Sequence, residues 1–173
     1  PLDALSELDA AIDLLDELVE KGLARQADSA NYDVHDLVRE FLILSMEPNL
    51  RNELHSNAVN WYRNRKNSAT DRIELIHHLH NSEQIDELTK VLSNEGHSLV
   101  QAGHTELLGI LRSLDREGFD SKSWVVVREL RGDILSIQGR WDDAEKEYDA
   151  AIPIARKNKQ NKELARLLSS RAD

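Results

Sequence analysis

Residues 32–41 read Tyr32-Asp33-Val34-His35-Asp36-Leu37-Val38-Arg39-Glu40-Phe41, and this stretch decides how the first part of the chain folds. Its first residues have the composition of a short strand, whereas its later apolar residues recur at helical spacing. Asp36 stands at the change between the two patterns, where a carboxylate can accept the free backbone amides of a helix start. We therefore predict a strand, a helix cap at Asp36 and a helix that buries Leu37, Phe41 and Leu44.

The residues before this stretch predict a helix and the first strand of a hairpin. Residues 23–26 and 32–35 flank a polar turn at residues 27–30, as in a short hairpin. Gly22 ends the preceding helix, whose apolar face carries Leu8, Ala11, Ile12, Leu15, Leu18 and Val19. A helix, a hairpin and a helix in this order predict a winged-helix domain over residues 1–47, truncated at its N-terminal end.

Every segment after Pro48 has the apolar spacing of a helix. Short breaks separate these segments, at Asn67-Ser68, Asn81-Ser82, Gly96, Gly103 and Gly118. Connections this short make neighbouring helices run antiparallel, because too little chain is left for a crossover. The tryptophans fall within the apolar stripes, so we predict core positions for Trp61, Trp124 and Trp141.

Six residues near the C-terminal end match the tetratricopeptide pattern, in which small residues let the two helices of a repeat pack closely. They are Gly132, Gly139, Trp141, Ala144, Tyr148 and Ala151. Arg128 and Arg131 occupy positions where that pattern has large apolar residues. The predicted fold is mainly α: the winged-helix domain is followed by antiparallel helical hairpins of a tetratricopeptide-like α-solenoid. A helical linker covers residues 48–118, and repeats that are truncated at their C-terminal end cover residues 119–173.

Composition and charge exclude several classes of protein. The chain has no cysteine and a net charge of −10 at pH 7, so we expect neither disulfides nor broad attachment to nucleic acid. No stretch approaches the roughly 18 apolar residues that cross a bilayer, and the N-terminal residues lack an export signal. We expect a cytoplasmic protein that does not contact membranes. DNA recognition is disfavoured by carboxylates on the helix before the hairpin, namely Asp9, Asp13, Asp16, Glu17 and Glu20.

Catalytic and metal sites are not predicted. No Ser-His-Asp or Cys-His arrangement stands out, so we assign no catalytic residue. His77, His78 and His80 suggest a metal, but two neighbouring imidazoles need further ligands and cysteine is absent. We therefore predict no metal ligand among these histidines.

The order of these parts resembles the C-terminal half of a STAND signal-transduction ATPase, the class that includes NB-ARC resistance proteins and the maltose regulator. In that family a P-loop ATPase core precedes a winged helix and sensor repeats. Val34-His35-Asp36-Leu37-Val38-Arg39 is similar to the family's Met-His-Asp motif, with Val34 in place of methionine. Ile76-His77-His78-Leu79, followed by a helix and Gly103, is similar to the helical linker before the repeats.

The resemblance implies that His35 contacts the β-phosphate of bound ADP and keeps the ATPase closed, while Asp36 fixes the local turn. An imidazole N–H can donate to a phosphate oxygen, so the chemistry is sound. The chain contains no Gly-x-x-x-x-Gly-Lys-Ser/Thr loop, so it is not expected to be an enzyme or to bind a cofactor by itself. ADP and ATP are expected only in a parent protein that supplies the core.

These expectations favour a regulatory and scaffolding module of a STAND-type signalling ATPase. Its winged helix would sense the nucleotide, and its repeats would bind a protein or peptide, or a small-molecule inducer. The first alternative is a stand-alone tetratricopeptide-like adaptor for protein–protein interactions. The second is a winged-helix DNA-binding transcription regulator.

Overall fold

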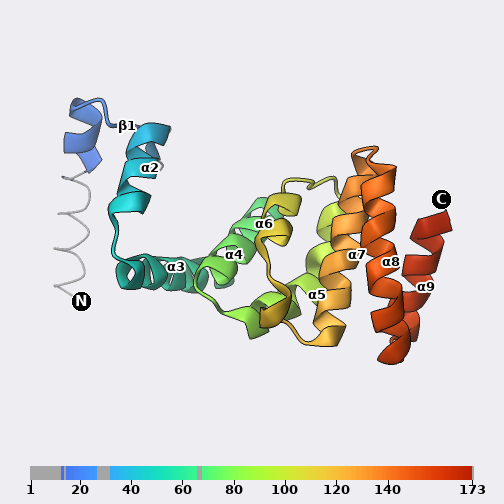
Figure 1. The fold of residues 1–173 in the computed structure, drawn as a ribbon. Coiled ribbons are helices and arrows are strands. Elements are labelled where there is room, and N and C mark those ends of the chain that lie inside the picture. The colour runs from blue at the N-terminus through green and yellow to red at the C-terminus, as the bar shows by residue number, and fades with distance from the viewer. Residues whose placement is uncertain (1–12, 14, 27–31, 66–67, 173) are drawn as a thin grey trace. The chain divides into compact units, whose positions relative to one another are not determined.

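The computed structural model describes residues 13, 15–26, 32–65 and 68–172. The chain divides into two compact units, Pro1–Arg51 and Asn52–Asp173. The described residues are mainly helical and include a small two-stranded sheet, which confirms the predicted mainly α class with a hairpin (Figure 1). Some predicted features lie outside the described residues: Leu8, Asp9, Ala11, Ile12, the turn at residues 27–30, and Asn67.

The hairpin of the first unit consists of β1 (Ala24–Gln26) and β2 (Tyr32–Val34), which pair antiparallel. Ala24 lies opposite Val34, and Arg25 lies opposite Asp33. The preceding helical residues end at Gly22, whose φ of +69° favours a residue without a side chain. The Leu23 amide donates to the Leu18 carbonyl at 2.9 Å, so the chain leaves the helix directly into β1.

Helix α2 (Asp36–Ser45) begins one residue earlier than a cap at Asp36 would require. His35 is the N-cap residue, because its carbonyl accepts the Val38 and Arg39 amides at 2.9 Å. The predicted cap at Asp36 is therefore wrong. The Asp36 carboxylate instead accepts a hydrogen bond from Arg39 Nη1 at 3.2 Å within the first turn.

The apolar face of α2 is exposed, so its predicted burial is also wrong. Leu37, Phe41 and Leu44 are 71%, 68% and 78% exposed. Helical spacing specifies which side chains share a face, but other segments must supply whatever covers that face.

The second unit is a succession of helices joined by short connections (Figure 1). Ser68 and Asp71 form a capping box at the start of α4, and Asp120 caps α7 by accepting two backbone amides. No helix among the described residues has the length and apolarity needed to cross a membrane. The helices are α3 (Pro48–Arg63), which starts in the first unit, α4 (Ala69–Asn81), α5 (Ile85–Gln101), α6 (Leu107–Ser113), the short 3-10 helix η1 (Arg116–Gly118), α7 (Ser121–Ile137), α8 (Trp141–Lys157) and α9 (Asn161–Ala172).

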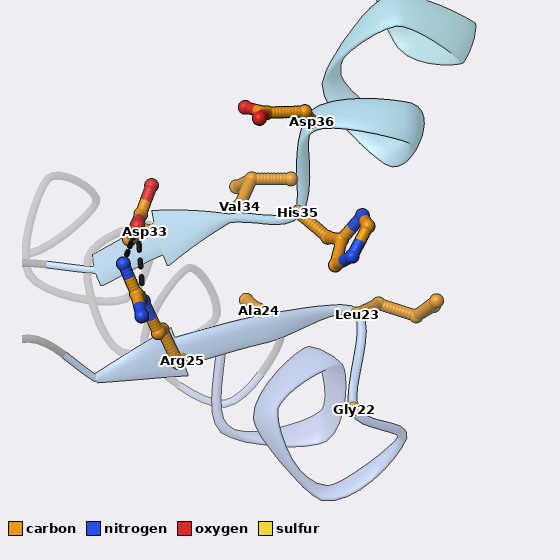
Figure 2. A pocket seen from close by; sticks show the side chains of 8 residues that line it. All are labelled: Gly22, Leu23, Ala24, Arg25, Asp33, Val34, His35 and Asp36. Atoms are coloured by element: carbon orange, nitrogen blue, oxygen red, sulfur yellow. Dashed lines mark hydrogen bonds and ion pairs between the residues drawn. The ribbon is translucent and has the colours of Figure 1, made fainter.

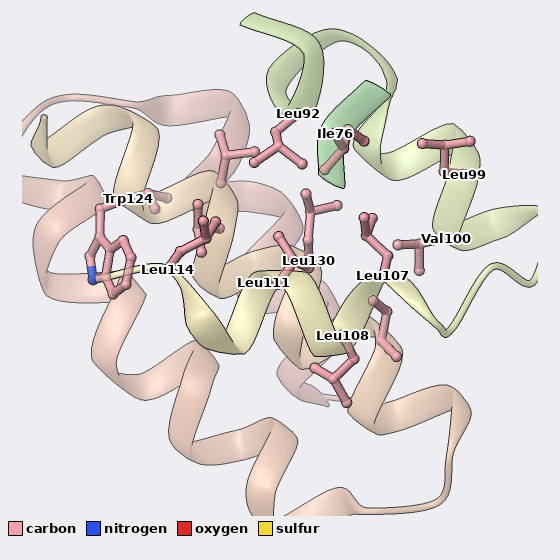
Figure 3. Packing of buried hydrophobic residues seen from close by; sticks show 14 of the residues in the cluster. Ile76, Leu92, Leu99, Val100, Leu107, Leu108, Leu111, Leu114, Trp124 and Leu130 are labelled. Atoms are coloured by element: carbon pink, nitrogen blue, oxygen red, sulfur yellow. The ribbon is translucent and has the colours of Figure 1, made fainter. Parts of the chain in front are cut away.

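One hydrophobic cluster holds these helices together, and it extends from Val59 on α3 to Leu167 on α9. Figure 3 shows part of it, around Ile76, Leu92 and Leu114. Leu107, Leu111 and Leu130 are fully buried within it. Of the three tryptophans, Trp124 is buried, as predicted from its place in an apolar stripe. The core prediction is wrong for Trp61 and Trp141, which are 53% and 61% exposed.

Two glycines inside helices permit close packing between neighbours. A Cβ on Gly96 would lie 2.5 Å from Leu130 Cδ1, so α7 approaches α5 at this point. Gly96 lies within α5, and the predicted helix break there is therefore wrong. A Cβ on Gly132 would lie 2.3 Å from Tyr148 Cε1, so α8 covers α7 too closely for any side chain at position 132.

Candidate functional site

The junction between β2 and α2 holds the backbone of His35 from both sides. Its amide donates to the Leu23 carbonyl at 3.2 Å, and its carbonyl accepts two amides of α2. The side chain is exposed and makes no capping hydrogen bond to α2. His35 and Asp36 leave the chain in different directions (Figure 2). They line one open pocket of about 470 Å³ together with Gly22, Leu23, Ala24, Arg25, Asp33 and Val34.

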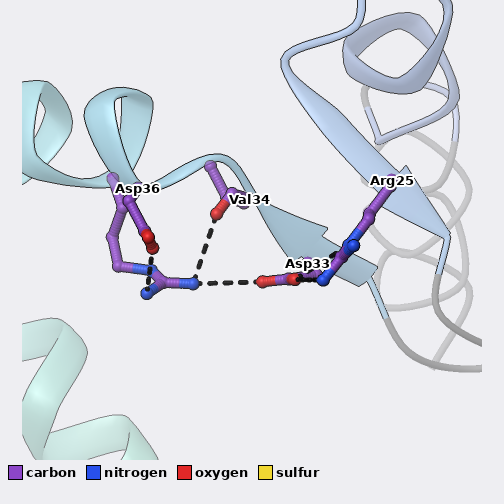
Figure 4. A network of polar contacts seen from close by, with 5 residues as sticks. Arg25, Asp33, Val34 and Asp36 are labelled. Carbon is purple, nitrogen blue, oxygen red and sulfur yellow. Dashed lines mark hydrogen bonds and ion pairs between the residues drawn. The ribbon is translucent and has the colours of Figure 1, made fainter.

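Three charged residues of this pocket, Arg25, Asp33 and Asp36, belong to a network of polar contacts (Figure 4). Asp33 Oδ2 accepts a hydrogen bond from Arg25 Nη2 at 2.7 Å, and its Oδ1 accepts one from Arg39 Nη2 at 3.1 Å. Arg25 and then Arg39 hold the pKa of Asp33 below its ordinary value. Arg39 also bonds Asp36 and the Val34 carbonyl, so it ties β2 to the first turn of α2. No pattern in the sequence indicated a role for Arg25 or Arg39.

An apolar hollow of about 580 Å³ lies on the same unit. Phe41, which is 68% exposed, is part of its wall. The other lining residues are Leu18, Leu23, Leu37, Val38 and Leu42. A hollow walled only by apolar side chains suits the apolar surface of another protein body better than a charged ligand.

The residues of the predicted repeat gather on α7 and α8. Gly139 makes the turn between these helices at a φ of +73°, and Ala144 and Ala151 are buried where the helices meet. Trp141 and Tyr148 line a hollow of about 220 Å³. The other residues around this hollow are Ser136, Asp142, Ala144, Glu145, Ser170 and Arg171, so α9 contributes to it as well.

A buried polar network, which no sequence pattern indicated, lies among α5, α7, α8 and α9. Glu129 on α7 is 1% exposed, and Arg166 on α9 donates to both of its carboxylate oxygens, at 2.6 and 3.0 Å. The two nitrogens of His97 on α5 lie 3.4 Å from Glu129 Oε2 and from Asp133 Oδ2. His97 Nε2 makes no hydrogen bond to Glu129, so the attraction between the two side chains is electrostatic. The Tyr148 hydroxyl donates to Asp133 Oδ1 at 3.0 Å.

The opposite charges of this network stabilise each other's ionised forms. Asp133 first, and then Glu129, raise the pKa of His97 to about 9, so the imidazole is protonated at neutral pH. Burial opposes ionisation of Glu129, but the positive charge of His97 and the charge and hydrogen bonds of Arg166 outweigh it and lower the pKa of this carboxyl. The network joins α5, α7, α8 and α9. We assign it a structural role, because each charge faces an opposite one.

Arg131 lies in the core despite its charge. It is 8% exposed, and it donates to the carbonyls of Leu111 and Leu114 at 2.9 and 3.0 Å. Its guanidinium lies 4.9 Å from the centre of the Trp124 ring. These hydrogen bonds satisfy free backbone carbonyls at the C-terminal end of α6. They and the Trp124 contact explain why an arginine stands where the repeat pattern has a large apolar residue.

The histidines of α4 separate into two environments. His80 lies 2.9 Å from the Ser113 hydroxyl, whereas His77 and His78 face His55 of α3. Burial first, and then His77 and His55, lower the pKa of His78 to about 4. His55 lies on another helix and far along the chain from His77, so no spacing rule could have linked them.

Comparison with protein-family models, curated proteins and solved structures gave no match. The resemblance to STAND ATPases therefore depends on the motif residues and on the order of the elements.

Proposed function

We propose that this chain is a regulatory and scaffolding module of a STAND-type signalling ATPase. Its first unit would sense the nucleotide held by a P-loop core, and its helical hairpins would bind a protein or peptide partner. The observation that carries the proposal is the exposed His35 ring on a backbone held between β2 and α2. This is the motif position to which the resemblance assigns the phosphate contact.

The proposed mechanism begins with a hydrogen bond from His35 to the β-phosphate of ADP. A neutral or protonated imidazole has an N–H for this bond, and the exposed ring can reach a ligand without displacing a neighbour. A shift of His35 is coupled to the start of β1 and to α2, because its backbone hydrogen-bonds Leu23, which precedes β1, and Arg39 in α2. Loss of the phosphate contact would then change how the hairpin and α2 hold the core.

The apolar face of α2 supports contact with the core itself. Leu37, Phe41 and Leu44 are each more than two-thirds exposed, and Phe41 lines the apolar hollow. Fully covering side chains of this size stabilises a contact by about 1.5–3 kcal/mol each. A docked ATPase core of the same polypeptide would supply this cover and place its nucleotide near His35.

The second unit supports the scaffolding role. Gly132 and Tyr148 bring α7 close to α8, the approach that a tetratricopeptide-like repeat would require, and α9 packs against α8. Trp141 is 61% exposed at the hollow that α9 shares, and exposed aromatic side chains are enriched among binding hot spots. We infer that a protein or peptide segment binds here with Trp141 as its principal contact.

The test is the nucleotide content of the full-length protein that contains this chain. Native protein is purified, denatured and analysed by chromatography beside the variants His35→Ala and His104→Ala. His104 bonds Glu106 in the second unit, so its variant controls for the loss of a histidine elsewhere. We expect ADP in the native protein and in His104→Ala, and its loss in His35→Ala. Full retention of ADP by His35→Ala would refute the phosphate contact.

The second candidate function is an adaptor without nucleotide control. The exposed Trp141 and its hollow favour this function whether or not an ATPase core exists. Absence of nucleotide from all three full-length proteins would support it. Peptide binding that is lost in Trp141→Ala would then define the adaptor surface.

A further inference from the structure

The second unit contains a group of three imidazoles that the nucleotide-sensing proposal does not use. His55 lies on α3, and His77 and His78 lie on α4. One ring nitrogen from each lies within 4.8 Å of the other two. The ring centroids form a nearly even triangle, with sides of 5.8, 5.1 and 5.2 Å. It is the one group among the described residues where side chains of metal-binding type come together in this way.

We propose that His55, His77 and His78 bind a divalent transition-metal ion of the zinc class and thereby join α3 to α4. Zinc bonds imidazole nitrogen at about 2.0–2.1 Å in tetrahedral geometry, which places two ligand nitrogens about 3.3 Å apart. The Nδ1 atoms of His55 and His78 are 2.8 Å apart, so they need to separate by only about 0.5 Å. The exposed His77 ring can turn to bring its nitrogen within the same range.

Neighbouring side chains orient the most buried of these ligands. The Tyr62 ring stacks on His78 with centroids 5.5 Å apart and an interplanar angle of 22°. His78 Nε2 lies 3.9 Å from Glu74 Oε2, on the side of the ring away from His55. A metal ligand commonly directs its second ring nitrogen to a carboxylate, which fixes the tautomer and raises the basicity of the first nitrogen. Glu74 would need to approach His78 Nε2 by about 1 Å to make this hydrogen bond.

The ligand set determines the class of metal. Imidazole nitrogen suits zinc, copper and nickel, whereas calcium and magnesium prefer oxygen ligands. Three protein ligands leave one tetrahedral position open for water or for a group from a partner. His80 does not belong to the set, because it pairs with Ser113.

The ion would strengthen a helix pair that few side chains hold together. Val59 is the one fully buried residue of α3 among those described, and His55 lies one helical turn before it. A bond from α4 to His55 would extend the contact toward the start of α3. The site lies in the second unit and does not involve His35, so its failure would leave the nucleotide proposal unaffected.

The test uses the 173-residue chain, freed of metal with a chelator and titrated with Zn²⁺ by calorimetry near neutral pH. We expect one tightly bound equivalent, and Co²⁺ should give the intense visible absorption of a tetrahedral site. His55→Gln and His78→Gln should weaken binding at least tenfold. His80→Gln and His104→Gln are matched controls and should bind as the native chain does.

A measurement on the native chain covers the case in which a variant does not fold. One equivalent of Zn²⁺ should shift the imidazole ¹⁵N resonances of His55, His77 and His78, and leave those of His80 and His104 in place. No stoichiometric binding would overturn the proposal. Equal binding by native chain and a folded His55→Gln variant, or shifts that spread over all the histidines, would overturn it as well.

Discussion

Replacing Gly132 with Ala tests how closely α7 and α8 pack. The added Cβ would lie 2.3 Å from Tyr148 Cε1 and 2.8 Å from Cδ1, closer than carbon atoms can approach. The ring cannot turn aside freely, because its hydroxyl donates to Asp133. Overpacking of this kind costs about 1–3 kcal/mol. Release of the Tyr148 hydroxyl from Asp133 would add about 0.5–1.5 kcal/mol.

Gly109→Ala is the matched control for this substitution. Gly109 also lies within a helix, α6, but a Cβ there meets no atom within 4 Å. Both variants gain the preference of alanine over glycine for a helix, at most about 1 kcal/mol. The difference between their free energies of unfolding therefore isolates the cost of the clash and of the released hydroxyl, and we expect about 1.5–4.5 kcal/mol in total.

Urea unfolding followed by circular dichroism measures this difference. Gly132→Ala should have the lower midpoint, and the cost should shrink when Tyr148 is replaced by Leu, because the obstructing ring is then gone. Equal free energies of unfolding for Gly132→Ala and Gly109→Ala would refute the packing described for α7 and α8.

Three further predictions concern the second unit. Ala151→Leu overfills a fully buried position of α8 and should lower the free energy of unfolding by about 1–3 kcal/mol, whereas Ala165→Leu at an exposed position of α9 should leave the urea midpoint nearly unchanged. Glu129→Gln leaves Arg166 and His97 without their buried counter-charge and should cost about 3–5 kcal/mol in thermal or urea unfolding. The exposed pair of Arg63 and Glu87 is the comparison, since Glu87→Gln should cost at most about 1 kcal/mol. The pKa of His97 is raised in the folded chain to about 9, so its stabilising charge is present below about pH 6.5 and is lost as pH rises through about 9. Native chain should therefore lose on the order of 3 kcal/mol more stability than His97→Gln between about pH 6 and pH 10, and parallel pH profiles would contradict this.

Local patterns were sufficient to predict the hairpin and most helices. The change from strand-like to helical spacing around His35 depends on neighbours in the chain, and the structure has β2 and α2 on either side of it. Gly103 has a φ of +92° after α5, so its break could be foreseen from residue type alone. Residue type alone could not distinguish Gly96 from such a break. Glycine is needed there because Leu130 of α7 packs against that position.

Burial was harder to predict than secondary structure. Leu37, Phe41 and Trp61 lie on apolar stripes, yet all three are exposed, because the stripe does not specify which segment covers it. Glu129 shows the opposite case. Its charge predicts an exposed position, but Glu129 is buried because His97 and Arg166 from two other helices neutralise that charge in the core.

The candidate sites also depend on contacts between distant residues. The motif identified His35 and Asp36, whereas Arg25 and Arg39 join them only through the paired strands and the first turn of α2. The three-histidine group likewise needs α3 to bring His55 to α4. The contact of His55 with α4 arises from the packing of two helices and carries no periodic signal in a single sequence.

The rate at which ADP leaves the full-length protein reports directly on the proposed contact between His35 and the β-phosphate. A hydrogen bond from His35 to a charged phosphate oxygen contributes about 1.5–3 kcal/mol, so its loss should speed release roughly ten- to a hundredfold. Stopped-flow displacement of a fluorescent ADP analogue would compare native protein with His35→Ala and His104→Ala. We expect faster release from His35→Ala alone. Equal release rates from all three proteins would contradict a nucleotide-sensing role for His35.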